Sequence, residues 1–98
     1  MVKNYELMVL FSPELTSDAL QKLQDKISQI ITSAGGKVSK LDAWGRRPIA
    51  YKIKKYTDAV YVVYYFSLDT AKAQEAERDV QLTDGVIRHV FIIAEEQA

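Results

Sequence analysis

The sequence predicts an α+β fold in which a four-stranded antiparallel sheet carries two helices on one face. Three observations support this class. Apolar residues alternate with a period of two in four segments. They recur at steps of three and four residues in two others. These segments follow one another in the order strand, helix, strand, strand, helix, strand. With 98 residues, 48% of them hydrophobic, the chain can fill a single core and has no length for a second one.

The first predicted strand covers residues 5–11, where Tyr5, Leu7, Val9 and Phe11 alternate with Glu6, Met8 and Leu10. Ser12-Pro13 ends this strand because proline cannot donate to a sheet ladder. Thr16 or Ser17 then caps a helix, which stops at Gly35-Gly36 because glycine readily adopts left-handed dihedrals. Apolar residues at helical spacing predict that one face of this helix is buried against the sheet: Leu20, Leu23, Ile27, Ile30 and Ile31.

Residues 37–55 are expected to form one long strand or two segments divided by a bulge at Gly45. Pro48 lacks a backbone donor, so this strand should lie at an edge of the sheet. The turn is placed at residues 56–58. Residues 59–68 are so rich in Val, Tyr and Phe that they predict a central strand with both faces covered.

A second helix is predicted to begin at Asp69-Thr70, with its apolar face at Ala73, Ala76, Val80 and Leu82. Asp84-Gly85 turns the chain into a last strand over residues 86–93. Short connections and right-handed crossovers convert this order into the split βαβ, or ferredoxin-like, two-layer sandwich, with the first and last strands adjacent. Residues 1–94 are expected to form this single domain, and residues 95–98 a short polar C-terminal tail.

Charge is unevenly distributed along a chain whose formal net charge is zero. Between residues 37 and 55, seven basic side chains stand against Asp42 alone, which gives this segment a charge of +6. The remainder has six basic and twelve acidic residues, a charge of −6. This asymmetry indicates an anionic partner at one edge of the molecule. The alternative is that a long hairpin protects its edges from aggregation with Lys and Arg.

The residues available for catalysis are few. With no cysteine and one histidine, the chain cannot form a Cys–His pair, a thiolate site or a multi-histidine metal cluster. His89 is interpreted as a polar residue on a strand, and the four glycines do not form a phosphate-binding loop. No apolar stretch approaches the roughly 18 residues that span a bilayer, and no signal-peptide pattern is present. We therefore expect no enzyme, no metal and no cofactor.

The sheet face opposite the helices is predicted to be partly apolar. Alternation places Tyr61, Val63 and Tyr65 on it, together with Met8 and Leu10, and Val90 and Ile92 from the last strand. Such a patch indicates either a protein partner or a platform for stacking RNA bases. The central strand has no glycine, lysine or arginine, so it lacks the basic-glycine-aromatic pattern of RNA-recognition domains. A protein partner is therefore the favoured interpretation.

The segment Trp44 to Ile53, WGRRPIAYKI, resembles the bacterial small-subunit ribosomal protein S-six family, whose pattern here is W-G-x-R-x-L-A-Y-x-I. Two further segments agree, namely Tyr5-Glu6 with the strand that follows and the closing run from Asp84 to Arg88. Pro48 and Lys52 depart from the family, which commonly has proline at position 52. The resemblance covers the whole chain in order and spacing.

This resemblance implies a ferredoxin-like fold and a non-catalytic, structural role in the small ribosomal subunit, in the cytoplasm. Members pair with ribosomal protein S-eighteen, and the heterodimer binds the central domain of the small-subunit ribosomal RNA at the platform. A member alone is expected to bind the RNA poorly. The predicted apolar face and basic hairpin agree with that division of roles.

Two sets of contact residues follow as hypotheses. Phosphate contacts are assigned to Lys3, Arg46, Arg47, Lys54 and Lys55. Arg47 has a structural alternative, because its guanidinium could instead stack on Trp44 or pair with Asp42. The surface for the protein partner is assigned to Met8, Leu10, Tyr61, Val63, Tyr65 and Arg88.

Two alternative functions stay open at this point. One is a regulatory module that binds a small molecule on the same fold, although the loop after the first strand lacks the glycines that would favour it. The other is a free-standing binder of single-stranded RNA, which the missing RNA-recognition pattern disfavours.

Overall fold

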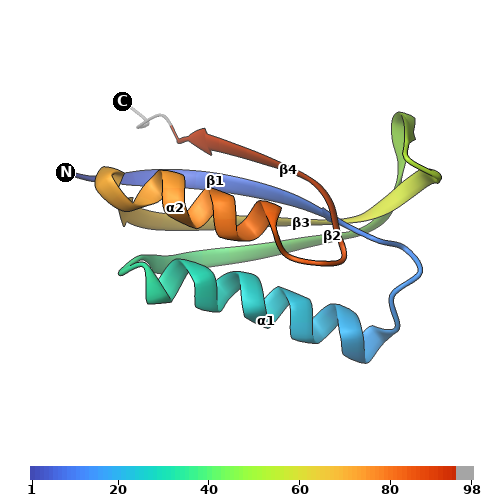
Figure 1. The fold of residues 1–98 in the computed structure, drawn as a ribbon, viewed down its shortest axis with the longest axis horizontal. Helices are drawn as coiled ribbons and strands as arrows, with labels where there is room; N and C mark the ends of the chain where they lie inside the picture. The colour runs from blue at the N-terminus through green and yellow to red at the C-terminus, as the bar shows by residue number, and fades with distance from the viewer. Residues whose placement is uncertain (95–98) are drawn as a thin grey trace.

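The computed structural model describes residues 1–94 and contains four strands and two helices (Figure 1). In chain order these are β1 (Val2–Phe11), α1 (Ser17–Ser33), β2 (Lys37–Ile53), β3 (Tyr56–Asp69), α2 (Thr70–Gln81) and β4 (Val86–Ile93). The strands form one antiparallel sheet in the order β2-β3-β1-β4. The predicted ferredoxin-like α+β class is confirmed, including the pairing of the first and last strands. The tail predicted at residues 95–98 lies outside the described residues.

The core lies between the sheet and the two helices. Alternate residues of the two central strands, β1 and β3, point toward the helices and are almost completely buried, as the sequence pattern predicted. The fully enclosed members include Leu7, Phe11, Val62 and Tyr64 from the strands and Ile27, Ile31 and Val80 from the helices. The Tyr64 hydroxyl donates to the Gln24 carbonyl at 3.0 Å. Burial raises the pKa of Tyr64, so its hydroxyl stays protonated as a donor.

The ends of α1 follow the expected capping chemistry. Thr16 is the N-cap, and its side-chain oxygen accepts from the Ala19 backbone N–H at 3.2 Å. The helix ends before Gly35, whose φ of +89° continues the chain in the left-handed region. One expectation for α2 is wrong. Leu82 belongs to the predicted buried face but is 71% exposed, because it stands at the C-cap, where the chain leaves the helix.

Strands β2 and β3 extend beyond the rest of the sheet. β1 ends at Phe11, which pairs with Val60, and Val60 also pairs with Arg46 of β2. Residues 46–60 therefore project as a two-stranded ribbon, which we call the arm and which turns away from the sheet in Figure 1. A bulge divides β2 at Gly45, where φ is +81°. Both that bulge and the edge position of Pro48 agree with the prediction.

The position of the hairpin turn differs from the prediction. The turn is made by Lys54 and Lys55, because Ile53 pairs directly with Tyr56, whereas residues 56–58 belong to β3. Aromatic and β-branched residues favour extended structure, so Tyr56 and Thr57 continue the strand. Lys54 adopts the turn with a φ of +55°. Both lysines consequently lie at the tip of the arm.

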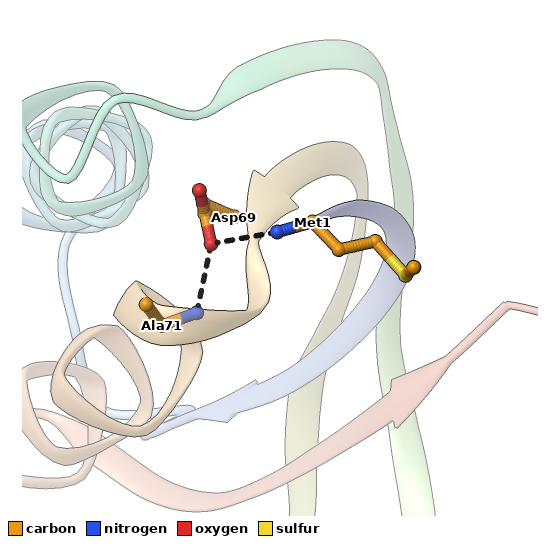
Figure 2. Close-up of polar contacts among 3 residues, drawn as sticks. All are labelled: Met1, Asp69 and Ala71. Atoms are coloured by element: carbon orange, nitrogen blue, oxygen red, sulfur yellow. Dashed lines mark hydrogen bonds and ion pairs between the residues drawn. The ribbon is translucent and has the colours of Figure 1, made fainter.

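The first residue of the chain is joined to the start of α2 (Figure 2). Asp69 caps the helix, and its Oδ1 accepts from the Ala71 backbone N–H at 2.9 Å. The same oxygen lies 3.4 Å from the Met1 amino group, and the Met1 carbonyl accepts from the Thr70 N–H at 2.8 Å. The pKa of Asp69 is lowered mainly by the hydrogen bond from Ala71, with the Met1 amine and Lys72 adding to the effect.

This depressed pKa predicts a specific pH dependence of stability. Because the folded state favours ionised Asp69, its contribution is complete above the ordinary pKa of 3.8 and is lost as the pH falls through the lower folded value. Asp69→Asn retains a capping oxygen but cannot titrate. We expect the difference in melting temperature between the two chains to shrink as pH falls from about 6 to about 2.5. Parallel melting curves over that range would contradict the assignment.

Candidate nucleic-acid and partner interfaces

The arm carries most of the positive charge that the sequence concentrates between residues 37 and 55. It contains two arginines and three lysines against the single acid Asp58, a net charge of +4. All five cationic side chains are exposed. A narrow ribbon with this charge presents cations to solvent on both faces and at its tip. The arrangement suits a polyanion that approaches the end of the molecule.

Two ion pairs lie on the side of the arm that faces the helices. Arg46 Nε donates to Asp58 Oδ2 across the two strands, and this hydrogen bond raises the pKa of Arg46. Lys55 Nζ lies 3.4 Å from Glu14 Oε1, in the loop between β1 and α1. Exposed pairs of this kind contribute little to stability, so they orient side chains more than they hold the fold.

On the opposite side, the base of the arm is organised around Trp44, which lies two residues before the arm begins. Its ring stacks on Tyr61 with centroids 6.2 Å apart and an interplanar angle of 10°. The Arg47 guanidinium lies 5.6 Å from the Trp44 ring centroid, and Arg47 Nε donates to the Trp44 carbonyl at 3.3 Å. Asp42 accepts from the indole Nε1 at 3.2 Å. Of the two structural alternatives for Arg47, the structure therefore adopts stacking on Trp44.

Arg88 connects the arm to the far edge of the sheet. It lies on β4, where it pairs with Leu10, and its Nη1 donates to the Tyr51 hydroxyl at 2.8 Å. Tyr51 belongs to β2, the strand at the other edge, so this contact joins the arm to β4 past the end of β1. Arg88 thus supports the conformation of the arm and lies on the face assigned to a partner.

The structure brings four of the five predicted phosphate-binding residues to the arm and leaves Lys3 apart. Lys3 pairs with Leu68 near the start of β1, and alternation turns it toward the helix side. The arm begins beyond Phe11, eight residues further along an extended strand, a separation of roughly 27 Å. Lys3 cannot contribute to the same local contact as the arm.

The open face of the sheet carries the predicted partner residues with unequal exposure. Met8, Tyr61 and Tyr65 are partly exposed. Leu10 and Val63 are each only 4% exposed, so the expectation that these two side chains stand outside is wrong. Both lie on central strands with a paired residue on either side: Tyr61 and Arg88 beside Leu10, and Met8 and Asp42 beside Val63. The exposed apolar residues of this face lie on the flanking strands: Trp44 (40%), Val90 (38%) and Ile92 (49%).

Sequence reasoning left out Trp44 and Tyr51 as contact residues. Trp44 is the extra residue of the β2 bulge, and Tyr51 lies in the irregular stretch of β2 near the tip. Simple alternation does not assign a face inside a bulge. The usable signal was compositional, because both are large aromatic residues within a strongly basic segment.

Other polar features of the described residues form no assembled chemical site. His89 Nε2 lies 3.1 Å from Glu77 Oε2, which joins β4 to α2 as expected for a polar strand residue. No cluster of potential metal ligands occurs within residues 1–94. A groove of about 360 Å³ between the helices is lined by side chains of both charges, including Lys26, Lys72, Glu75 and Asp79. No helix in the described part of the chain has the length and apolarity to cross a membrane.

The fold and these surfaces define the class as a ferredoxin-like interaction protein with a cationic arm and an open, partly apolar sheet face. The family model for ribosomal protein S6 matches residues 4–92. The chain therefore belongs to the ribosomal protein S6 family, as the segment around Trp44 predicted.

Curated relatives and solved structures agree with this family. The small ribosomal subunit protein bS6 of Moorella thermoacetica is 37% identical over 97 residues and covers 99% of both chains. The bS6 protein of Micrococcus luteus is 40% identical over 96 residues, which covers 98% of this chain and 95% of the relative. The crystal structure of 30S ribosomal protein S6 from Thermotoga maritima aligns with a TM-score of 0.90 at 29% identity, covering 96% of this chain and 89% of the other.

A fold likeness of lower identity is also found. The C-terminal domain of the MgtC protein from Mycobacterium tuberculosis has a TM-score of 0.67 at 15% identity, which reflects the shared fold only.

Membership in the ribosomal family makes the chain a structural, non-enzymatic constituent of the small ribosomal subunit. The same membership confirms the expected ribosomal, cytoplasmic localisation.

The stack of Trp44 on Tyr61 can be tested by fluorescence, because Trp44 is the only tryptophan in the chain. Tyr61→Leu removes the ring that covers one side of the indole. We expect faster acrylamide quenching and a red-shifted emission maximum, since the indole becomes more hydrated. Tyr56→Leu, on the other side of the arm, serves as the matched control. Equal quenching in both variants would show that the stack is not formed in solution.

Proposed function

We propose that this chain binds the small-subunit ribosomal RNA through its arm and binds ribosomal protein S-eighteen through the open face of its sheet. The two proteins would dock together on the central domain of the RNA, at the platform. The observation that carries the proposal is the separation of charge in space. Five exposed cations extend on a ribbon beyond the sheet, while the rest of the molecule is net negative.

The arm supports RNA binding by its charge and by its shape. Phosphate contacts from lysine and arginine release condensed counterions, and this supplies much of the affinity for nucleic acid. Lys54 and Lys55 at the tip and Arg46 and Arg47 at the base offer four such contacts. Lys3, at the other end of β1, stays a prediction for a second and separate contact.

The negative remainder of the molecule argues that the chain needs a companion. A charge of −6 outside residues 37–55 repels a polyanion over most of the surface. A basic protein bound to the open face would reverse that field near the arm. Association would then be cooperative, because each protein improves the electrostatic environment of the other on the RNA.

The open face supports a protein partner through its exposed apolar side chains. Trp44, Val90 and Ile92 are each more than a third exposed and lie on strands at the two edges of the sheet. Tyr61, Tyr65 and Met8 lie between them and are partly exposed. Apolar and aromatic side chains in this arrangement are typical of the centre of a protein interface. Leu10 and Val63 would support that surface from below.

Reversing the charges at the tip of the arm tests the RNA contact. With ribosomal protein S-eighteen present, Lys54→Glu/Lys55→Glu should bind a transcribed central-domain fragment at least about tenfold more weakly. The slope of log affinity against log salt should become shallower by about 1.4–1.8, since two phosphate contacts are lost. Filter binding at several salt concentrations measures both quantities.

A matched control places the same charge change on α1. Lys22 and Lys26 are exposed on that helix and lie outside the arm, and Lys26 lines the groove between the helices. Lys22→Glu/Lys26→Glu should reduce affinity through the general field and leave the salt slope nearly unchanged. An arm variant whose slope matches that of the unsubstituted chain would remove Lys54 and Lys55 from the RNA contact.

Truncating the aromatic residues of the open face tests the protein contact. Tyr61→Ala and Tyr65→Ala should each weaken binding to ribosomal protein S-eighteen by about 1–3 kcal/mol in calorimetry. Tyr56→Ala, on the helix side of the arm, makes the same chemical change away from the proposed interface and should leave affinity intact. Unchanged affinity in the first two variants would place the interface elsewhere.

If the chain alone bound the RNA as tightly as the pair, a free-standing RNA binder would be favoured.

A further inference from the structure

The two adjacent arginines of the arm are each held by the same atom, Nε. Arg46 Nε donates to the Asp58 carboxylate, and Arg47 Nε donates to the Trp44 carbonyl at 3.3 Å. Within residues 1–94, neither arginine donates a hydrogen bond from Nη1 or Nη2. Both side chains therefore have one end fixed by the arm and present their terminal nitrogens outward.

The two guanidinium groups lie on opposite faces of the arm. Arg46 pairs in register with Val60, which packs against the core beneath the helices. Arg47 lies over Trp44, which stacks on Tyr61 of the open face. Neighbouring residues of an extended strand point to opposite sides, and the contacts of each arginine agree with that geometry.

The terminal nitrogens of arginine form a planar fork that matches two oxygens of one phosphate. A freely rotating arginine loses side-chain freedom when it binds, at a cost to affinity. An arginine already fixed at Nε has lost part of that freedom before the ligand arrives. The arm thus presents two oriented phosphate sites on opposite faces, at neighbouring positions of one strand.

We propose that the arm is a two-sided phosphate clamp, in which Arg46 and Arg47 bind phosphates from two different backbone segments of one folded RNA. Asp58 and the Trp44 carbonyl are the positioning groups. This inference rests on the proposed function of RNA binding and specifies the kind of RNA. A groove or junction in which two backbones flank the arm satisfies both faces, whereas a single strand along one side satisfies only one.

Asp58 supplies the most direct support for this clamp. It is the single acid within the arm, and simple electrostatics makes it unfavourable for binding a polyanion. We infer that Asp58 favours binding through its contact with Arg46 Nε, because this contact leaves the terminal nitrogens of Arg46 directed toward solvent. Glu14 makes a superficially similar pair with Lys55, but an ammonium group has no planar fork to orient.

The test asks whether Asp58→Ala weakens or strengthens the binding of RNA. Asp58→Ala removes a negative charge, so electrostatics alone predicts tighter RNA binding. Positioning predicts the reverse, and we expect affinity for the central-domain fragment, with ribosomal protein S-eighteen present, to fall by about 3- to 10-fold. Asp58→Asn keeps a neutral acceptor for Arg46 Nε and should restore affinity at least to that of the unsubstituted chain.

Two further comparisons isolate the mechanism. In an Arg46→Met background, Asp58→Ala should no longer weaken binding, because no guanidinium is left to position. Glu14→Ala is the matched control for loss of an acid next to an arm cation. It should leave binding unchanged or make it up to about twofold tighter. Melting temperatures of all variants establish that each chain is folded.

The two-sided geometry is tested by additivity and by competition. Arg46→Met and Arg47→Met should each reduce the salt slope by about 0.9, and the double variant by the sum, since each contacts its own phosphate. An unstructured single strand of equal length should compete poorly with the folded fragment. Equal competition by that strand would overturn the two-backbone geometry.

The outcomes separate this inference from the function on which it rests. If the unsubstituted pair binds the fragment and Asp58→Ala binds as tightly or more tightly, the positioning role is overturned while RNA binding stands. If the unsubstituted pair fails to bind the fragment at all, the proposed function is itself contradicted, and the clamp with it.

Discussion

The pairing of β3 with both of its neighbours is the constraint on which the rest of the structure depends. β3 pairs with all ten residues of β1 and continues past Phe11, where its only partner is β2. On the shared length, alternation buries one face of β3 beneath the helices. The part of β3 that precedes Val60 lies beyond the end of β1, has no helix above it and forms one side of the arm. A difference in strand length therefore creates the cationic projection.

Charge separation in this molecule follows from that architecture. The edge strand β2 carries the basic residues, where they also protect an exposed ladder from aggregation. The acidic residues of the described part of the chain lie mostly on helices and loops outside the arm, although Glu14 pairs with Lys55 at its tip. A net charge of zero thus conceals a strong local field at one end. Because the chain belongs to a ribosomal protein family, we propose that this field attracts RNA. The negative charge of the rest of the molecule is the reason for the proposed dependence on a basic companion.

The open face shows how neighbouring side chains modify a pattern of alternation. Leu10 and Val63 alternate onto the open face, yet they are nearly buried, because each lies on a central strand between paired residues of two neighbouring strands. Alternation does not place Trp44, because Trp44 is the extra residue of the bulge in β2. Its ring lies between Tyr61 and Arg47 and contacts both. The exposed apolar surface of this face thus gains Trp44, which alternation did not place, and loses Leu10 and Val63.

Local chemistry in the sequence by itself determined the elements, their order and most of their ends. Thr16 and Asp69 cap helices, Gly35 and Gly45 adopt positive φ, and residues 86–93 form the predicted strand. Each of these depends on neighbours along the chain or on a period of two or 3.6 residues. Because the family pattern around Trp44 is also local, the family too was determined at this level.

Only the tertiary structure decided which distant groups meet. The pairs Arg46–Asp58, Arg88–Tyr51 and Lys55–Glu14 join residues whose approach depends on bulges, on the true position of the turn and on the curvature of the arm. The separation of Lys3 from the other predicted phosphate contacts has the same origin. Strand register is a property of the assembled sheet, and a shift at one bulge moves every later side chain relative to its partners.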